Sequence, residues 1–183
     1  MISIDTNILL YAQNQDCAEH VAASAFLAEC ARRDDVAICE LVLAELYQLL
    51  RNPAVVERPL DAPEAAEVCQ GFRHNPHWAL IENGPVMDKV WSFVARPRTA
   101  RRRLFDARLG FTLRYHGVRG LATRNVGDFD GLGFEKVWDP IAEALARAGA
   151  LDDREADALE DHVRSVRSRP GRTVADTGAE RDT

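Results

Sequence analysis

Short apolar segments alternate with longer helical segments along residues 1–140, and this alternation limits the possible folds more than any other feature of the chain. Strands are predicted at residues 1–5, 36–39, 78–81, 120–123 and 136–138. Helices are predicted at residues 7–12, 18–31, 41–52, 63–73, 85–94 and 99–116. Because neighbouring parallel strands need long crossover connections, this order predicts an α/β fold with a short parallel sheet flanked by helices on both faces.

The composition is that of a globular protein. The chain has 183 residues, of which 46% are hydrophobic, so it can bury a full core. No apolar run reaches the length of about 18 residues that spans a bilayer, and the N-terminus does not resemble a secretory signal. We therefore expect a cytoplasmic protein without a membrane segment, whose four cysteines are free thiols.

Arginine is concentrated in one part of an otherwise acidic chain. The formal net charge is −6, yet residues 96–124 contain nine Arg and a single acid, Asp106. A local band of positive charge suits the phosphates of a nucleic acid. The alternative is an ordinary solvated helix face.

Two carboxylates follow predicted strands. Asp5 comes directly after the first strand, and Asp128 lies in the loop after residues 120–123. Open parallel sheets bind ligands at the carboxyl ends of their strands, so both positions suit a functional site. Each acid also has a purely structural interpretation, because Asp5 could cap the next helix and Asp128 could stabilise a turn.

Two further carboxylates lie on helix faces that are otherwise apolar. Glu45 has leucines at helical spacing on both sides, which predicts that it lies on a buried stripe. Asp106 has leucines after it and Arg102 one turn before it, so a surface salt bridge is its alternative role. Gly110 in the same predicted helix costs about 1 kcal/mol relative to Ala, which indicates close packing there.

Four ionised carboxylates in one crevice would repel each other strongly at low dielectric. Such a cluster either takes up protons or holds divalent cations. Ligands that are all oxygen favour Mg²⁺ or Mn²⁺ over zinc, and Mg²⁺ held by carboxylates characteristically acts on phosphates. If Asp5, Glu45, Asp106 and Asp128 meet, we expect a metal centre for phosphate chemistry.

The same four acids lie in blocks that closely resemble the acidic motifs of PIN-domain ribonucleases, in the same order and with matching spacing. The blocks are Ile-Asp-Thr-Asn-Ile-Leu at 4–9, Leu-Val-Leu-Ala-Glu-Leu at 41–46, Phe-Asp-Ala-Arg-Leu at 105–109 and Thr-Arg-Asn-Val-Gly-Asp-Phe at 123–129. Arg-Asn-Pro at 51–53 and Trp-Asp-Pro at 138–140 resemble the VapC toxin branch of that family. The resemblance covers residues 1–141 and implies a PIN-like three-layer fold.

The resemblance implies an endoribonuclease that depends on Mg²⁺ or Mn²⁺ and hydrolyses structured RNA such as tRNA or ribosomal RNA, leaving 5′-phosphate and 3′-hydroxyl ends. It implies that Asp5, Glu45, Asp106 and Asp128 are the catalytic and metal-binding residues. It also implies that the protein is the toxin of a toxin–antitoxin pair, forms a homodimer and is neutralised by a VapB-type antitoxin.

Further positions take their expected roles from the same resemblance or from the arginine band. Thr6, Asn7 and Thr123 match small polar positions that orient metal ligands, and Asn125 stands where many relatives have a further Asp. The predicted RNA-binding residues are Arg98, Arg101, Arg102, Arg103 and Arg108.

Two other functions are consistent with the sequence. The chain could be a non-catalytic RNA-binding or protein-interaction module on a PIN-like fold, since Asn125 replaces an acid and a long tail follows the common domain. It could also be a phosphatase with a nucleophilic Asp after a strand, although that chemistry generally places a second Asp where Asn7 stands.

The chain is predicted to divide near residue 141. Residues 1–141 form the PIN-like nuclease domain, and residues 142–183 form a C-terminal helical extension followed by a disordered tail. Within that extension we expect a helix at 141–148 and a weak apolar stripe at 152–166, which is either a solvated or a docking helix.

Overall fold

The computed structural model describes residues 1–149, and Met1–Leu145 form one compact unit. All strands of this unit lie in a single parallel sheet with the order β3-β2-β1-β4-β5. The strands are β1 (Ile2–Ile4), β2 (Val36–Cys39), β3 (Ala79–Ile81), β4 (Gly120–Ala122) and β5 (Lys136–Trp138). The predicted α/β fold with a short parallel sheet is therefore confirmed.

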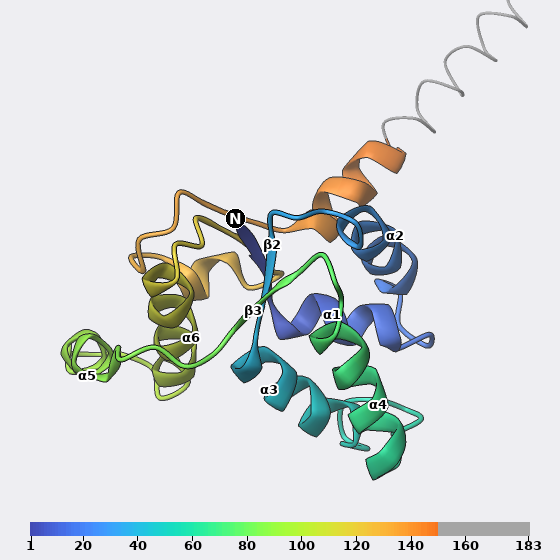
Figure 1. Cartoon of the computed structure of the whole chain (residues 1–183), viewed down its shortest axis with the longest axis horizontal. Helices are drawn as coiled ribbons and strands as arrows, with labels where there is room; N and C mark the ends of the chain where they lie inside the picture. Colours follow the sequence, from blue (N-terminus) through green and yellow to red (C-terminus); the bar gives the residue numbers. More distant parts are fainter. Residues whose placement is uncertain (150–183) are drawn as a thin grey trace, which may run out of the picture. The chain divides into compact units, whose positions relative to one another are not determined.

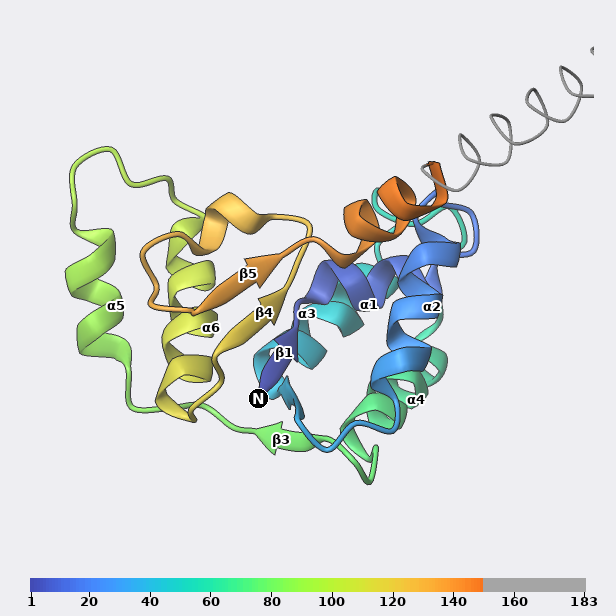
Figure 2. The ribbon, with the colours of Figure 1, turned by 90° about the horizontal axis from the view of Figure 1, so that it is seen from above.

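Helices cover both faces of this sheet. They are α1 (Thr6–Gln13), α2 (His20–Cys30), α3 (Glu40–Leu50), α4 (Ala62–Arg73), α5 (Met87–Val94) and α6 (Arg103–Tyr115), with a short 3₁₀ helix η1 at Val126–Phe129. Helices α1 to α4 pack together on one side of the sheet, and α5 and α6 pair on the other (Figures 1 and 2). This arrangement follows from right-handed crossovers that run outward from β1 to β3 and then return to β4.

The short apolar runs become strands because helices bury them on both sides. The side chains of Ile4, Ile38 and Leu121, one on each central strand, are fully buried. All-parallel strands covered on both faces require such near-continuous apolar sequences. The central strands therefore form a rigid base beneath the polar residues that follow them.

The sheet changes winding direction between β1 and β4, which are neighbours. The chain leaves β1 toward β2 on one side and reaches β5 from β4 on the other side. Asp5 follows β1 directly, and its N–H donates to the Ala122 carbonyl of β4 at 3.0 Å. Thr123 follows β4 directly. Open α/β sheets form a ligand-binding crevice at such a switch point.

The longest predicted helix, at residues 99–116, is shorter than expected at its start. Helix α6 begins at Arg103, because Arg98 adopts a left-handed backbone with φ of 67° and Thr99 Oγ1 donates to the Arg96 carbonyl at 2.7 Å. This turn geometry is incompatible with a right-handed helix. Arg98 and Arg101 therefore lie in the connection between α5 and α6, and Asp106 falls in the first turn of α6.

The C-terminal helix begins at 140 and continues to 149, the last described residue, in agreement with the helix predicted at 141–148. The predictions for 152–166 and for the tail lie outside the described residues. Within residues 1–149, no helix is long and apolar enough to cross a membrane. The cysteines of this part of the chain are free thiols, as predicted.

Candidate active site

Asp5 is the most constrained of the four predicted acids. Its side chain is only 7% exposed, and it caps α1 by accepting a hydrogen bond from the Thr6 N–H at 2.8 Å. The second carboxylate oxygen accepts from Asn7 Nδ2 at 2.7 Å and from Thr123 Oγ1 at 2.6 Å. Asp5 is thus both a helix cap and a carboxylate held in one orientation at the switch point.

Asn7 and Thr123 join the ends of β1 and β4, as their predicted orienting role requires. Asn7 Nδ2 also reaches Thr123 Oγ1 at 3.0 Å, and Asn7 Oδ1 accepts from the Arg124 N–H at 3.2 Å. Asn125 contributes its backbone, whose N–H donates to Thr123 Oγ1 at 3.0 Å. The Asn125 residue itself is exposed, and its predicted contribution to metal binding stays a prediction.

Thr6 connects Asp5 with Glu45. Its hydroxyl donates to Glu45 Oε2 at 2.6 Å, so α1 fixes an acid that belongs to α3. The prediction that Glu45 lies on a buried stripe is wrong, because the buried face of α3 is formed by Val42, Leu43, Leu46 and Leu50, and Glu45 is exposed beside it. This position leaves the carboxylate open toward solvent while Thr6 restricts its orientation.

Asp106 enters the site from the other face of the sheet, on α6. Its Oδ2 is buried without a hydrogen-bond partner, although such atoms normally have one. Gly110, one turn later, allows α6 to approach the loop after η1, because a Cβ at this position would come within 2.6 Å of Leu132 Cδ1. The close packing predicted at Gly110 is therefore present, and it brings the helix of Asp106 against the segment that carries Asp128.

Asp128 lies on η1, where two arginines restrain it. Arg102 Nη2 approaches Asp128 Oδ1 at 3.4 Å. Arg103 Nη2 donates to the Asp130 carbonyl at 3.1 Å, and its Nη1 approaches the Gly127 carbonyl at 3.5 Å. Both arginines of α6 and its start thus contact the loop of Asp128, and their predicted role in RNA binding stays a prediction.

The four acids influence one another electrostatically. Burial, opposed by its hydrogen bonds and reinforced by the charge of Glu45, raises the pKa of Asp5 from 3.8 to about 6. Burial and the charges of Asp128 and Asp5 raise the pKa of Asp106 to about 6, against the attraction of Arg103 and Arg102. The structure therefore brings all four predicted acids to one end of the sheet.

The donor set fits a hard divalent cation in its chemistry. The available ligands are carboxylate oxygens, and the buried Oδ2 of Asp106 has no hydrogen-bond partner that would compensate its charge. Within residues 1–149, however, no three Asp, Glu, His or Cys side chains converge closely enough to form a complete metal cage. Mg²⁺ commonly keeps several waters and is bound through one or two carboxylates, so a complete cage of protein ligands is not required.

The remaining predicted RNA-binding residues differ in their surroundings. Arg108 Nη2 contacts Asn83 Oδ1 at 3.3 Å, whereas Arg98 and Arg101 are exposed. Arg124 was not predicted to have a functional role. In the structure it forms ion pairs with Asp139 at 3.1 Å and with Glu19 at 3.5 Å. No local pattern indicates these pairs, because the partners come from different elements.

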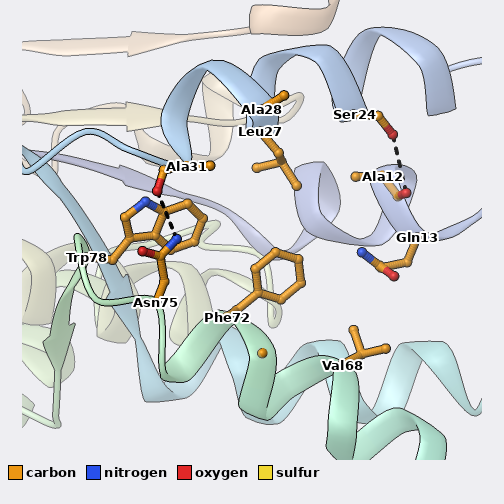
Figure 3. Close-up of a pocket in the computed structure, with 11 residues that line it drawn as sticks. Ala12, Gln13, Ser24, Leu27, Ala28, Ala31, Val68, Phe72, Asn75 and Trp78 are labelled. Atoms are coloured by element: carbon orange, nitrogen blue, oxygen red, sulfur yellow. Dashed lines mark hydrogen bonds between the residues drawn. The ribbon is translucent and has the colours of Figure 1, made fainter.

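A separate cavity of about 490 Å³ lies between α1, α2 and α4 (Figure 3) and contains none of the predicted acids. Its lining is mainly apolar, and two of the polar side chains that Figure 3 shows form hydrogen bonds to backbone carbonyls. Ser24 Oγ donates to the Ala12 carbonyl at 3.4 Å, and Asn75 Nδ2 donates to the Ala31 carbonyl at 3.1 Å. This cavity therefore lacks groups for phosphate chemistry.

Known proteins resemble the chain in sequence and in fold. Ribonuclease VapC24 of Mycobacterium tuberculosis, in strains CDC 1551 / Oshkosh and ATCC 25618 / H37Rv, is 71% identical over 141 residues, which are 77% of this chain and 97% of the relative. No family model matches the sequence.

Solved structures share the fold at low sequence identity. The M. tuberculosis toxin VapC20, described as cleaving the sarcin–ricin loop, has a TM-score of 0.57 and 21% identity, covering 73% of this chain and 96% of its own. FitAcB from Neisseria gonorrhoeae has a TM-score of 0.54 and 18% identity, covering 76% of this chain and 98% of its own. The structure of FitAB bound to a DNA fragment has a TM-score of 0.53 and 17% identity, covering 77% of this chain and 96% of its own.

Proposed function

The chain belongs to the VapC family of PIN-domain ribonuclease toxins, and from this premise we propose that it is a metal-dependent endoribonuclease acting on structured RNA. One observation carries the metal dependence: the Oδ2 atom of Asp106 is buried in the site without a hydrogen-bond partner. Uncompensated charge of this kind at a switch point favours binding of a divalent cation.

Each acid has a role in this proposal. Asp5, Glu45, Asp106 and Asp128 would hold Mg²⁺ or Mn²⁺, and such a cation activates water and neutralises charge on a phosphodiester. Asn7 and Thr123 fix the carboxylate of Asp5, and the Thr6 hydroxyl fixes that of Glu45. Loss of hydrogen bonds of this type typically lowers metal affinity or activity by about 10- to 100-fold.

Ribosomal RNA and tRNA are the proposed substrates. Support for ribosomal RNA comes from VapC20, which is described as a toxin that cleaves the sarcin–ricin loop and shares the fold. The exposed arginines between α5 and α6 supply positive charge near the acids for a phosphate backbone.

Cleavage of total RNA tests this proposal. Wild-type protein is incubated with Mn²⁺, with Mg²⁺ or with EDTA, alongside Asp5→Asn, Asp106→Asn and the control Asp130→Asn, which removes an exposed acid from the same loop as Asp128. We expect discrete fragments with metal from wild type and control, and none with EDTA or from the two site variants. Undiminished cleavage by both site variants would contradict the assignment, and end-mapping of the fragments identifies the RNA.

We further propose a homodimer that a VapB-type antitoxin neutralises, with residues 142–183 as an extension outside the nuclease domain. The match to a curated relative over 141 residues supports the division of the chain. Light scattering after gel filtration measures the oligomeric state. Co-expression with the neighbouring small open reading frame should relieve growth inhibition, and persistent inhibition would argue against that antitoxin.

A further inference from the structure

A second cavity, with a more polar lining, lies on the α5 side of the sheet and includes Gly131 of the loop after η1. Its volume is about 430 Å³, within the usual range for small-molecule sites, and α5, α6 and the loop after η1 form its walls. Its lining includes Lys89, Ser92, Phe93, Arg96 and Phe111. The exposed cations Lys89 and Arg96 beside the buried ring of Phe93 make this cavity chemically unlike the apolar one between α1, α2 and α4.

Positive charge exceeds negative charge near this cavity. Among the residues that the structure describes, Lys89, Arg96, Arg98 and Arg101 form no ion pair, whereas Arg33, Arg58, Arg73 and Arg124 each pair with a carboxylate. One acid, Asp88, also lines the cavity. In a chain with a net charge of −6, a group of unpaired cations on one connection and one helix indicates a site for a polyanion.

The cavity shares a wall with the segment that carries Asp128. Gly131, which lines the cavity, follows η1 closely. The Arg103 guanidinium lies 5.3 Å from the ring centre of Phe93 and donates to the Asp130 carbonyl at 3.1 Å. Arg103 therefore connects a ring that lines the cavity with the loop that carries Asp128.

The lining suits an unpaired nucleotide. The Arg96 guanidinium lies 4.8 Å from the ring centre of Phe93, so the ring supports a planar cation at the rim. Unpaired RNA bases stack on arginine planes and aromatic side chains, and nearby lysines contact the phosphates. Both groups are present here, in Arg96 and in Lys89.

We propose that the cavity between α5 and α6 binds one unpaired nucleotide of the RNA substrate adjacent to the cleaved bond. Arg96 stacks on the base, and Lys89 contacts its phosphate. This proposal rests on the proposed ribonuclease function, because it assigns part of the same substrate. It makes the α5 side of the site a contributor to the choice of RNA, beyond the metal-binding acids.

Binding of RNA in EDTA tests the proposal without requiring catalysis. The probe is a fluorescein-labelled 12-nucleotide single-stranded RNA, and anisotropy is measured over a range of salt concentrations with full-length protein. The test variant is Lys89→Gln/Arg96→Gln. The matched control is Arg119→Gln/Lys136→Gln, which removes the same charge from exposed residues at β4 and β5.

We expect the test variant to bind the RNA more weakly than the wild type. The slope of log affinity against log salt concentration should become less negative by about 0.7 for each lost phosphate contact. The control should retain the wild-type slope. Equal weakening of both variants would show only a non-specific effect of net charge and would overturn the assignment of the cavity.

A series of RNAs with one abasic position tests the base contact itself. In wild type, one position should weaken binding by about 5- to 150-fold, the range found for stacked bases. In Arg96→Lys, which keeps the charge but loses the planar group, the loss at that position should shrink. If no position responds, or if Arg96→Lys responds like wild type, the base contact is refuted.

The outcomes separate this proposal from the proposed function. Metal-dependent cleavage by the wild type, together with unaltered RNA binding by the test variant, would overturn the nucleotide-binding role of the cavity but not the ribonuclease function. Localised binding without any cleavage would refute the ribonuclease mechanism and the placement of the nucleotide next to a cleaved bond, and the cavity would remain a nucleotide-binding site.

Discussion

The buried carboxyl group of Asp5 predicts that the metal-free protein becomes less stable as the pH rises toward neutrality. Its pKa is about 6 in the folded chain and 3.8 ordinarily, so the folded state binds the proton more tightly than the unfolded state. The resulting stability is fully present below pH 3.8 and is lost as the pH rises through 6. The whole shift corresponds to about 3 kcal/mol, at about 1.4 kcal/mol for each pH unit.

Between pH 4.5 and 7, about 2 kcal/mol of this free energy should disappear, because the proton is already partly lost from the unfolded chain at pH 4.5. For a protein of this size, that change lowers Tm by about 4–8 °C. The Asp5→Asn variant has no ionisable group at this position. Its unfolding free energy should therefore fall by about 2 kcal/mol less than that of the wild type between pH 4.5 and 7.

Chemical denaturation at both pH values, in EDTA, measures this difference. Asp88→Asn, which removes an exposed acid on α5, controls for the loss of one charge. The pH dependence of Asp88→Asn should match that of wild type, and only Asp5→Asn should deviate. The argument fails if wild type and Asp5→Asn lose the same free energy between the two pH values.

Three further predictions follow from single contacts. Gly71→Ala should raise Tm by up to about 4 °C, because Ala favours helices and its Cβ would meet no atom within 4 Å. Gly110→Ala should lower Tm, because its Cβ would meet the Leu132 side chain at 2.6 Å. Equal Tm shifts of the two variants in thermal melts would refute this contrast. Thr6→Val removes the hydrogen bond to Glu45, so calorimetry should show about 10- to 100-fold weaker Mn²⁺ binding. An unchanged Mn²⁺ affinity would exclude an orienting role of the Thr6 hydroxyl. Thr123→Val removes a hydrogen bond that lowers the pKa of Asp5, so the acid limb of the pH profile of cleavage should move to higher pH; a limb that stays in place would speak against Asp5 as the titrating group.

The sequence predicted those features that depend on local pattern or on strand order. The strand-end position of Asp5 and the close approach at Gly110 could be read from the residues nearby, because capping and helix propensity are local properties. The parallel sheet followed from the alternation of elements. In agreement with these predictions, Asp5 follows β1 and Asp106 lies on helix α6.

Features that depend on packing between distant elements were missed. Glu45 was placed on a buried stripe because leucines surround it in sequence, but the orientation of α3 against the sheet decides which leucines are buried. Arg102 and Arg103 carried no signal that they restrain the Asp128 loop, because their partners lie 24 to 27 residues away. Such pairings follow from tertiary structure and have no local signature.

The hydrogen bond between Asp5 and Thr123 joins residues 118 positions apart. A chain emerging from the ribosome therefore exposes Asp5 early and acquires its orienting partner only after most of the domain has been synthesised. Contacts of such long range form late, because the loop they close is costly in entropy. The order of synthesis thus delays the assembly of the candidate site until β4 is present, and a truncated nascent chain carries Asp5 without the Thr123 hydroxyl that orients it.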